Sequence, residues 1–387
     1  MKPFYLNGML RSLVFALVGI FTPVFLYKLG IEEFGAAKYG IMLVAGYYIV
    51  MRITTLAGVI PISWIIKKIG FRRSIAISLL ILAINLGSLL FAGNHFWLVL
   101  VSAIAGGLNI PFYWVARSSA ISQDSDKVQV GRQLGNLMTI EQITTMLGPF
   151  AAGMIIEKWG FQPLYILALV ILVISVIPLL SMPHHTHLNG ASWRGFGLWL
   201  TNRRYFHIGV GIGSRAIDDY SISVLWPLAI FAMGIRVGTM GGIFTLVAIA
   251  SLVVRMVIGR VFDKLHAKHD FSDELLYGVS ACVNSIAWIL RIFVGSVGAI
   301  LLLDMSGTIF GTTYSSLYVD YELLGGKRMG SIAYWVYGEM IYSLMAIGLF
   351  LMVGVSAWYG IWKEVFMILA SFWVLISIVM ARESNLK

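Results

Sequence analysis

The chain has 387 residues, of which 59% are hydrophobic and only 12% are charged, and its mean hydropathy is +0.86. Soluble domains average about 45–50% apolar and about 25% charged residues, so this composition excludes a soluble globular protein and indicates an integral membrane protein. The formal net charge of +10 does not indicate a nucleic-acid partner, because the basic residues gather in loops on one side of the predicted membrane.

Apolar runs of about 18–25 residues, each long enough to cross about 30 Å of hydrocarbon as a helix, recur along the chain. We expect twelve of them, at residues 8–29, 40–66, 73–93, 96–119, 134–156, 164–182, 205–233, 241–262, 275–294, 297–319, 330–353 and 361–381. The first run is expected to span the membrane instead of being cleaved as a signal peptide, since it lacks a small-residue cleavage site. The predicted class is therefore an all-α membrane protein with twelve transmembrane helices.

The loops between these spans alternate between a basic set and a weakly basic set. The set that includes both termini holds sixteen lysines and arginines, and the opposite set holds five. Because basic loops stay on the cytoplasmic side, both termini are predicted to be cytoplasmic, in a bacterial or archaeal cytoplasmic membrane.

The longest polar loop, 183–204, is interpreted as a cytoplasmic linker between two halves, 1–182 and 205–387. It contains the run HHTH at 184–187. Since no carboxylate or thiol accompanies these histidines, we interpret the run as solvated linker, and we expect no metal site and no cofactor.

The two halves carry an internal repeat in their first helices. Three residues recur at a constant offset of 204: Arg11, Pro23 and Gly30 in the first half, and Arg215, Pro227 and Gly234 in the second. The fifth and eleventh helices also begin alike, with GRQLG at 131–135 and GKRMG at 326–330. Repeated halves of this kind build the central site of secondary transporters.

Residues 259–268 read GRVFDKLHAK, which resembles the loop motif of the major facilitator superfamily, a glycine followed after three residues by an aspartate and a basic residue. The motif positions are Gly259, Arg260, Asp263 and Lys264. The equivalent loop of the first half, SWIIKKIGFRR at 63–73, keeps basic residues and a glycine but lacks the aspartate. GPFAAG at 148–153 is similar to the family's fifth-helix motif.

This resemblance covers essentially the whole chain and implies two pseudo-symmetric six-helix bundles. By analogy, the motif residues would form part of a cytoplasmic latch that holds one conformation. Their alternative role is helix capping and membrane topology.

The seventh helix carries Arg215, Asp218 and Asp219 at i, i+3 and i+4, so they are expected to share a face that continues to Trp226. The resemblance implies that the first, fourth, seventh and tenth helices line a central cavity, where charges meet water and substrate instead of lipid. One arginine against two aspartates leaves a surplus carboxylate, which favours a proton or cation role. The alternative is that Arg215 neutralises one aspartate only to hold packing.

The eleventh helix places Glu339 between Trp335 and Tyr342. An isolated glutamate between aromatic rings would be a proton carrier near neutral pH. Arg52 lies at mid-depth on the second helix, which adjoins the eleventh in this family, and a salt bridge with Glu339 would make the pair an interdomain strut. Both readings stay open, and proton coupling is predicted at Glu339 or Asp219.

Other buried charges are expected to be structural. Glu141 on the fifth helix and Arg255 on the eighth are predicted to pair near the cytoplasmic end. Asp304 and Arg291 are predicted to pair at the outer ends of the tenth and ninth helices, and Arg117 to reach the inner headgroups.

Aromatic side chains complete the predicted cavity: Tyr113 and Trp114 on the fourth helix, Trp226 on the seventh, and Tyr314 and Tyr318 on the tenth. Their convergence predicts a substrate with apolar or aromatic surface, or a cation held by ring faces.

The sequence thus predicts a monomeric secondary active transporter, not an enzyme, that moves a small amphipathic organic solute by alternating access, coupled to protons. The alternatives are a translocator of lipids or lipid-linked sugars, or a sensor that transports nothing and is separated from a carrier only by solute flux. A membrane-embedded enzyme is disfavoured because the sequence contains no HExxH, GxSxG or GxxxxGK[ST] motif.

Overall fold

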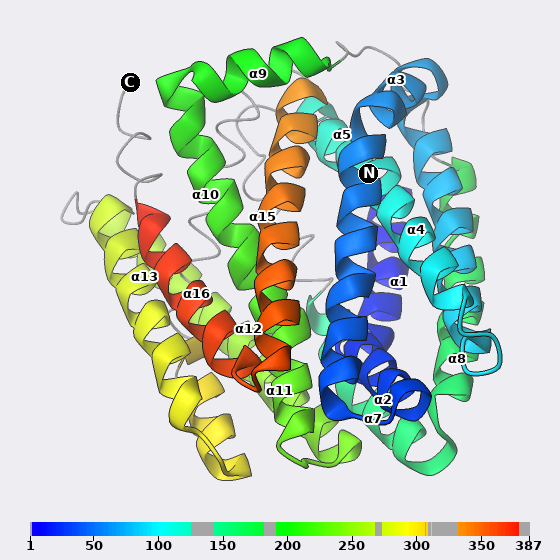
Figure 1. Ribbon diagram of the computed structural model, residues 1–387. Coiled ribbons are helices and arrows are strands. Elements are labelled where there is room, and N and C mark those ends of the chain that lie inside the picture. The colour runs from blue at the N-terminus through cyan, green and yellow to red at the C-terminus, as the bar shows by residue number, and fades with distance from the viewer. Residues whose placement is uncertain are drawn as a thin grey trace.

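Every regular element is a helix in the residues that the computed structural model describes, which are 2–124, 142–181, 191–267, 273–305, 307–308, 311 and 332–378. The long helices stand side by side and run in roughly one direction (Figure 1). Within these residues, six helices are long and apolar enough to cross a membrane. Ala37–Phe91 is one of the six and covers the predicted span 40–66 and all but the last two residues of the predicted span 73–93.

The helices of the first half are interrupted at prolines and glycines. They are α1 (Lys2–Val18), α2 (Thr22–Phe34), α3 (Ala37–Phe91), α4 (Leu98–Ile110), the π-helix Pro111–Val115, α5 (Ala116–Asp124), α7 (Gly148–Trp159) and α8 (Phe161–Ile174). The backbone of α3 leaves the helical region at Gly70, where φ is +80°. Only glycine adopts this conformation without strain, so α3 consists of two helices joined at this residue.

The second half contains the linker helix and a second set of long helices. These are α9 (Trp193–Thr201), α10 (Arg203–Tyr220), the π-helix Ser221–Leu225, α11 (Trp226–Ala232), α12 (Val237–Ala267), α13 (Asp273–Leu290), α15 (Ile332–Trp358) and α16 (Trp362–Ile376).

The repeated prolines break both halves at the same place. The gap between α1 and α2 falls just before Pro23, and the π-helix after α10 falls just before Pro227. Proline lacks the N–H that an α-helix uses and clashes with the carbonyl four residues earlier, which accounts for both interruptions. The repeated glycines serve different purposes, since Gly30 gives α2 close contact with Gly40 of α3, whereas Gly234 has a φ of +85° after α11.

The helices form two bundles that meet along two helix pairs. Helices α1, α2, α3, α4 and α8 pack on one another, as do α10, α13, α15 and α16, and the two groups are joined where α3 meets α15 and where α7 meets α12. At the second contact a Cβ on Gly241 would lie 2.4 Å from the carbonyl oxygen of Pro149, so the absence of a side chain allows the two backbones to touch. We call these the first bundle and the second bundle.

The two ends of the molecule differ. Helix α9 lies across one end, here the linker end, and the turns between α2 and α3, α7 and α8, α11 and α12, and α15 and α16 lie at the other, here the distal end (Figure 1). These turns contain Gly35, Gly160, Gly234 and Gly360. At the distal end the bundles touch, with the rings of Tyr27 and Phe231 6.0 Å apart. The two bundles are therefore in contact at the distal end.

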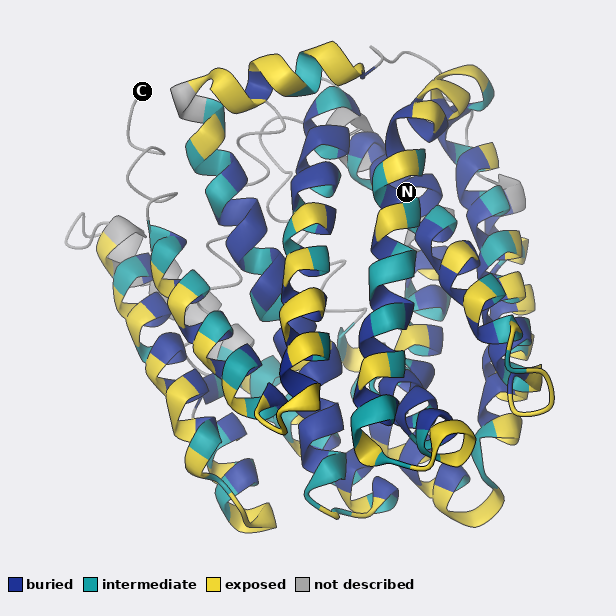
Figure 2. Cartoon of the chain, in the orientation of Figure 1, coloured by how far each residue is buried: buried dark blue, intermediate teal, exposed yellow. Residues whose placement is uncertain are grey.

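The linker helix is attached to both bundles. The indole N–H of Trp64 on α3 donates to the carbonyl of Ala191 at 2.9 Å, and the hydroxyl of Tyr337 on α15 donates to the carbonyl of Ser192 at 3.1 Å. The Ser192 side chain caps α9 by accepting from the amide of Gly195 at 3.0 Å. Figure 2 shows that most of α9 is exposed.

Large apolar side chains face outward along the long helices. Leu80, Val173 and Leu302 are examples that a soluble protein would bury. Figure 2 shows such exposed positions along the outer sides of the helices and buried positions between them. In a protein with this composition the exposed apolar surface contacts lipid.

Candidate functional site

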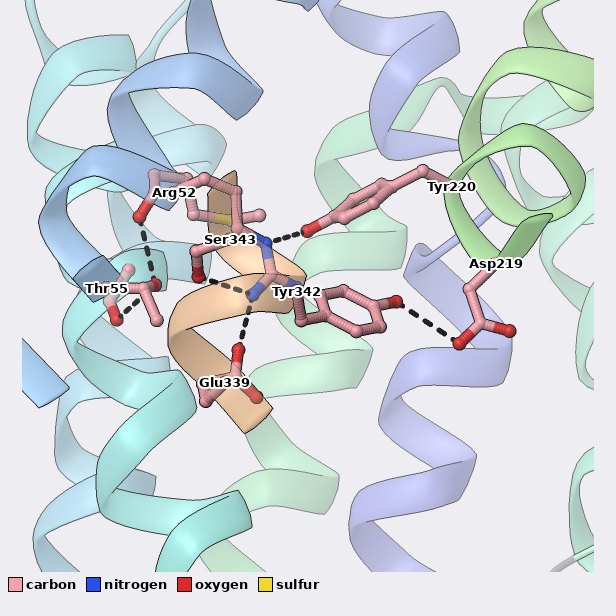
Figure 3. Close-up of polar contacts among 9 residues, drawn as sticks. Arg52, Thr55, Asp219, Tyr220, Glu339, Tyr342 and Ser343 are labelled. Atoms are coloured by element: carbon pink, nitrogen blue, oxygen red, sulfur yellow. Dashed lines mark hydrogen bonds and ion pairs between the residues drawn. The ribbon is translucent and has the colours of Figure 1, made fainter. Parts of the chain in front are cut away.

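A buried ion pair joins the two bundles at the middle of the α3–α15 contact. The Nη1 atom of Arg52 on α3 lies 2.5 Å from Oε1 of Glu339 on α15. The same nitrogen donates to the hydroxyl of Ser343 at 3.4 Å, and Nε donates to the hydroxyl of Tyr220 at the end of α10. Figure 3 shows Arg52 at the centre of these contacts. The predicted neighbours Arg52 and Glu339 are thus brought together.

Aromatic rings surround this ion pair. The guanidinium carbon of Arg52 lies 4.9 Å from the ring centroid of Tyr220 and 4.7 Å from that of Tyr342. Tyr48 stacks on Phe350 at 4.9 Å on the neighbouring side of Tyr220. The rings keep water away and add cation–π contacts, which strengthens the electrostatic interaction inside the cluster.

Close helix packing fixes the position of Arg52. The hydroxyl of Thr55, one turn further along α3, donates to the carbonyl of Gly107 on α4 at 2.9 Å. A Cβ on Gly107 would lie 2.3 Å from the carbonyl oxygen of Met51, so only glycine permits this approach of α4 to α3.

The charges on α10 extend the same network. Nε of Arg215 lies 3.0 Å from Oδ2 of Asp219, one turn further along the helix. The hydroxyl of Tyr342 donates to the same oxygen at 3.2 Å, as Figure 3 shows. The Asp219 side chain is 40% exposed, in contrast to the largely buried pair of Arg52 and Glu339.

Asp218 points to different neighbours from Asp219. Its Oδ1 atom accepts the indole N–H of Trp288 on α13 at 2.8 Å. Among the described residues it makes no ion pair. The expectation that Arg215, Asp218 and Asp219 act on one shared face is therefore only partly met, because Asp218 accepts a hydrogen bond from Trp288 of α13.

A second buried network lies inside the second bundle. Nη2 of Arg291 lies 3.0 Å from Oδ1 of Asp304, and the indole of Trp226 donates to Oδ2 at 2.8 Å. Trp226 is fully buried in this conformation, and its place in a solute cavity stays a prediction. The ring lies in the interior of the second bundle, where its N–H donates a hydrogen bond to the buried carboxylate of Asp304.

The first bundle has its own cationic cluster. The guanidinium carbon of Arg11 on α1 lies 3.5 Å from the ring centroid of Tyr113, and that of Arg117 lies 5.8 Å from the same ring. Arg117 is buried, so the expectation that it reaches the headgroups is wrong. Tyr113 is also buried, whereas its neighbour Trp114 is 45% exposed.

Several predicted site residues lie outside the described residues. They are Glu141, Tyr314 and Tyr318. For Arg255 and the loop motif residues Gly259, Arg260, Asp263 and Lys264, the description covers only the backbone of α12. In the described part of the chain no group of three or more metal-ligating side chains occurs.

Some residues of the site were missed by the sequence reasoning. Tyr220 directly follows the two aspartates, and its phenol was not considered as a partner for Arg52. Trp288 was not considered because its indole N–H has no signature in the sequence. Arg11 has a usable signal in the sequence, since it repeats Arg215 at an offset of 204 and has Phe15 where the second half has Asp219.

Comparisons with known proteins agree with this architecture. The family profile of the Major Facilitator Superfamily matches residues 4–348. This chain belongs to the Major Facilitator Superfamily, and it is a membrane-spanning protein of that transporter family.

Two solved structures with the same fold are those of the fucose:proton symporter FucP of Escherichia coli and of FucP in the outward conformation. The first has a TM-score of 0.66 and 13% sequence identity, and covers 99% of this chain and 98% of that chain. The second has a TM-score of 0.64 and 14% identity over the same shares of the two chains. At these identities the likeness is one of fold.

Curated relatives include the multi-drug resistance efflux pump PmrA of two Streptococcus pneumoniae strains. Each is 28% identical to this chain over 165 residues, which is 42% of this chain. The match spans 39% of the length of each pump, which is less than half of those proteins.

Proposed function

We propose that this chain is a secondary active transporter that moves a small organic solute by alternating access and couples this movement to protons. The observation that carries the proposal is the buried ion pair of Arg52 and Glu339, because each bundle supplies one partner. When one bundle rocks against the other, these two side chains separate. The pair is then a strut that forms in one state of the cycle and breaks in another.

Proton coupling follows from the cost of a buried charge without a partner. Removing one member of a buried pair costs about 3–5 kcal/mol, so Glu339 is expected to take up a proton when Arg52 moves away. Asp219, which contacts Arg215 and Tyr342, is the second proposed proton site. Asp218 is the surplus carboxylate of α10, since it has an indole donor but no ion-pair partner among the described residues.

The proposed topology has twelve spans, a linker at 183–204 and two bundles, 1–182 and 205–387, with the linker end in the cytoplasm of a bacterial or archaeal cell. In this topology the distal end faces outward. Trp114 and the charges of α10 are the proposed solute contacts, and the protein is proposed to work as a monomer. The efflux-pump relatives support an amphipathic organic solute, and the fucose:proton symporter neighbour supports proton coupling.

The proposal is tested in proteoliposomes that contain a trapped pH-sensitive dye. Sugars, amino acids, aromatic carboxylates and amphipathic amines are added in turn, and one class is expected to move protons together with the solute. Glu339→Gln should abolish this coupled movement while the solute still stabilises the protein in a thermal-shift assay. The control Glu33→Gln changes an exposed carboxylate and should leave coupling unchanged.

Two results would count against the proposal. Coupled proton movement that persists in Glu339→Gln would remove Glu339 from the coupling step. Solute binding without flux in the unmodified protein would support a sensor.

A lipid translocator is the second candidate, and a surface groove favours it. The groove has a volume of ≈ 390 Å³, lies between α3 and α15, and is lined by apolar residues that include Met42, Ile49, Phe350 and Val355. Its lining includes the exposed side chains of Leu351 and Trp358, so the groove is open to the surface, and an apolar groove of this kind can hold an acyl chain. Gly46 also lines the groove, and a Cβ added to it would meet no other atom within 4 Å. Gly46→Leu therefore fills the groove and should slow translocation of a fluorescent phospholipid without slowing solute flux.

A further inference from the structure

Arg11 is a buried arginine without an acidic partner. Its side chain on α1 is only 2% exposed. Nη2 donates to the amide oxygen of Asn109 at 2.6 Å, Nη1 lies 3.5 Å from the hydroxyl of Ser78, and Nε makes no hydrogen bond. No described carboxylate forms an ion pair with this guanidinium. Since arginine remains protonated, a full positive charge is buried here without a counter-ion.

The internal repeat shows what is missing. Arg215, the equivalent of Arg11 at an offset of 204, has Asp219 four residues later at 3.0 Å. The residue four positions after Arg11 is Phe15, whose ring centroid lies 5.2 Å from the Arg11 guanidinium carbon. The first bundle thus keeps the arginine of the repeat and has a phenyl ring in place of the carboxylate.

The surroundings of Arg11 carry a second positive charge and no nearby acidic side chain among the described residues. The ring of Tyr113 covers one face of the guanidinium, and Arg117 adds a second cation beside that ring. The acidic side chains described in the first bundle are Glu32, Glu33 and Glu157, which all lie near the distal-end turns at Gly35 and Gly160. A cation–π contact offsets part of the desolvation of an arginine but does not neutralise it.

The helix that carries Tyr113 is also irregular. Residues Pro111–Val115 form a π-helix, a feature that is frequent at functional sites because it displaces side chains from the regular helical register. Trp114 lies in this segment and is exposed. Its ring centroid lies 5.3 Å from the guanidinium carbon of Arg117, so an apolar or aromatic group has a ring surface available beside this second cation.

We propose that Arg11, together with Ser78 and Asn109, binds an oxyanion of the transported solute, a carboxylate or phosphate group attached to an apolar or aromatic body. The planar guanidinium presents paired N–H donors that match these groups, and the free Nε and the long contact to Ser78 leave donor capacity unused. Arg11 is covered in this conformation, so the anion enters in another state of the cycle. The inference that the anion is transported rests on the proposed function, whereas the inference that Arg11 binds an anion does not.

The test measures binding to the purified protein in a neutral detergent. The probes are benzoate and phenyl phosphate, with benzamide as the uncharged control, and the readouts are thermal stabilisation and tryptophan fluorescence. The two anions should bind and benzamide should bind at least roughly 10-fold more weakly, as expected for loss of a charged hydrogen bond. Equal binding of benzamide and benzoate, or no binding of either anion, would overturn the proposal.

The variants use the repeat as a guide. Phe15→Asp places a carboxylate four residues after Arg11, where Asp219 stands relative to Arg215. This carboxylate competes with benzoate for Arg11, so benzoate binding should weaken roughly 10- to 100-fold while the protein stays folded. Phe15→Asn is the matched neutral control and should bind benzoate as the unmodified protein does. Arg11→Lys keeps the charge but loses the paired donors, and should weaken binding too. Benzoate binding that is equal in Phe15→Asp and Phe15→Asn would refute the site.

Two further comparisons separate the possible sources and outcomes. Short-chain phosphatidic acid, compared with the matching phosphatidylcholine, distinguishes a lipid headgroup from a soluble anion, and both carry the oxyanion chemistry that the site requires. If Phe15→Asp weakens anion binding but the unmodified protein shows no solute flux, the binding site is supported and the transport proposal is rejected. If solutes move together with protons but neither anion binds more tightly than benzamide, the transport proposal is supported and the anion site is rejected.

Discussion

The ion pair between the bundles allows a double-mutant cycle whose outcome is asymmetric. The changes are Arg52→Met, Glu339→Gln and their combination, and the measurement is thermal unfolding in detergent. The two single changes differ because the partners left behind differ. Arg52 also contacts the hydroxyls of Tyr220 and Ser343 and two aromatic rings, whereas Glu339 has only Arg52 as a hydrogen-bond partner among the described residues.

The magnitudes follow from these contacts. Arg52→Met leaves a buried carboxylate without compensation and should cost about 3–5 kcal/mol. Glu339→Gln leaves a cation that keeps its other contacts and an amide oxygen that still accepts, so the cost should be about 1.5–3 kcal/mol. The double variant replaces that uncompensated carboxylate by a neutral amide, so it should lose less than Arg52→Met alone, which gives a coupling energy of at least about 2 kcal/mol.

These energies give measurable differences in Tm. At roughly 2–4 °C per kcal/mol for a unit of about 150–250 residues, Arg52→Met should lower Tm by roughly 6–20 °C and Glu339→Gln by roughly 3–12 °C. The deficit of Arg52→Met should shrink as the pH falls, because an unpartnered buried carboxylate can be neutralised by a proton. Equal losses from the two single changes, or additive losses in the double variant, would refute the reasoning.

Two more predictions concern the ends of the molecule. Gly241→Ala introduces a Cβ 2.4 Å from the carbonyl oxygen of Pro149 and should separate α7 from α12, so that an engineered cysteine at the distal end is labelled faster than in the unmodified protein; unchanged labelling would contradict this. Tyr337→Phe removes the hydroxyl that donates to the carbonyl of Ser192 at 3.1 Å and accepts from its amide at 3.2 Å, and it should speed proteolytic cleavage near α9. Two neutral hydrogen bonds at about 0.5–1.5 kcal/mol each correspond to a Tm loss of roughly 2–12 °C. A cleavage rate equal to that of the unmodified protein would show that this contact does not hold the linker.

The membrane class and the helical fold could be predicted because lipid restricts the choice of structure. Without water in the hydrocarbon, each backbone N–H and C=O has to be paired within its own helix, so long apolar runs indicate spanning helices. The breaks before Pro23 and Pro227 were also implied by the sequence, because proline affects its own helix. The number of spans and the assignment of the halves stay predictions beyond the six long apolar helices described.

The candidate site was predictable only where one helix or a known helix neighbour supplied both partners. Arg215 and Asp219 meet because they are one turn apart on α10. Arg52 and Glu339 were expected to meet only because the family resemblance places the second and eleventh helices side by side. Glu141 and Arg255, predicted by the same reasoning, remain a prediction.

The sequence by itself determined the class of protein, the helical segments, the repeat and the presence of charges inside them. Only the tertiary structure decided which partner each charge has. Asp218 accepts a hydrogen bond from Trp288, Asp304 accepts one from Trp226, and Arg11 has no acidic neighbour among the described residues. The physical reason is that hydropathy and helical spacing act along one helix, whereas a buried charge is satisfied by side chains from whichever helices pack against it. A sequence pattern does not specify that packing.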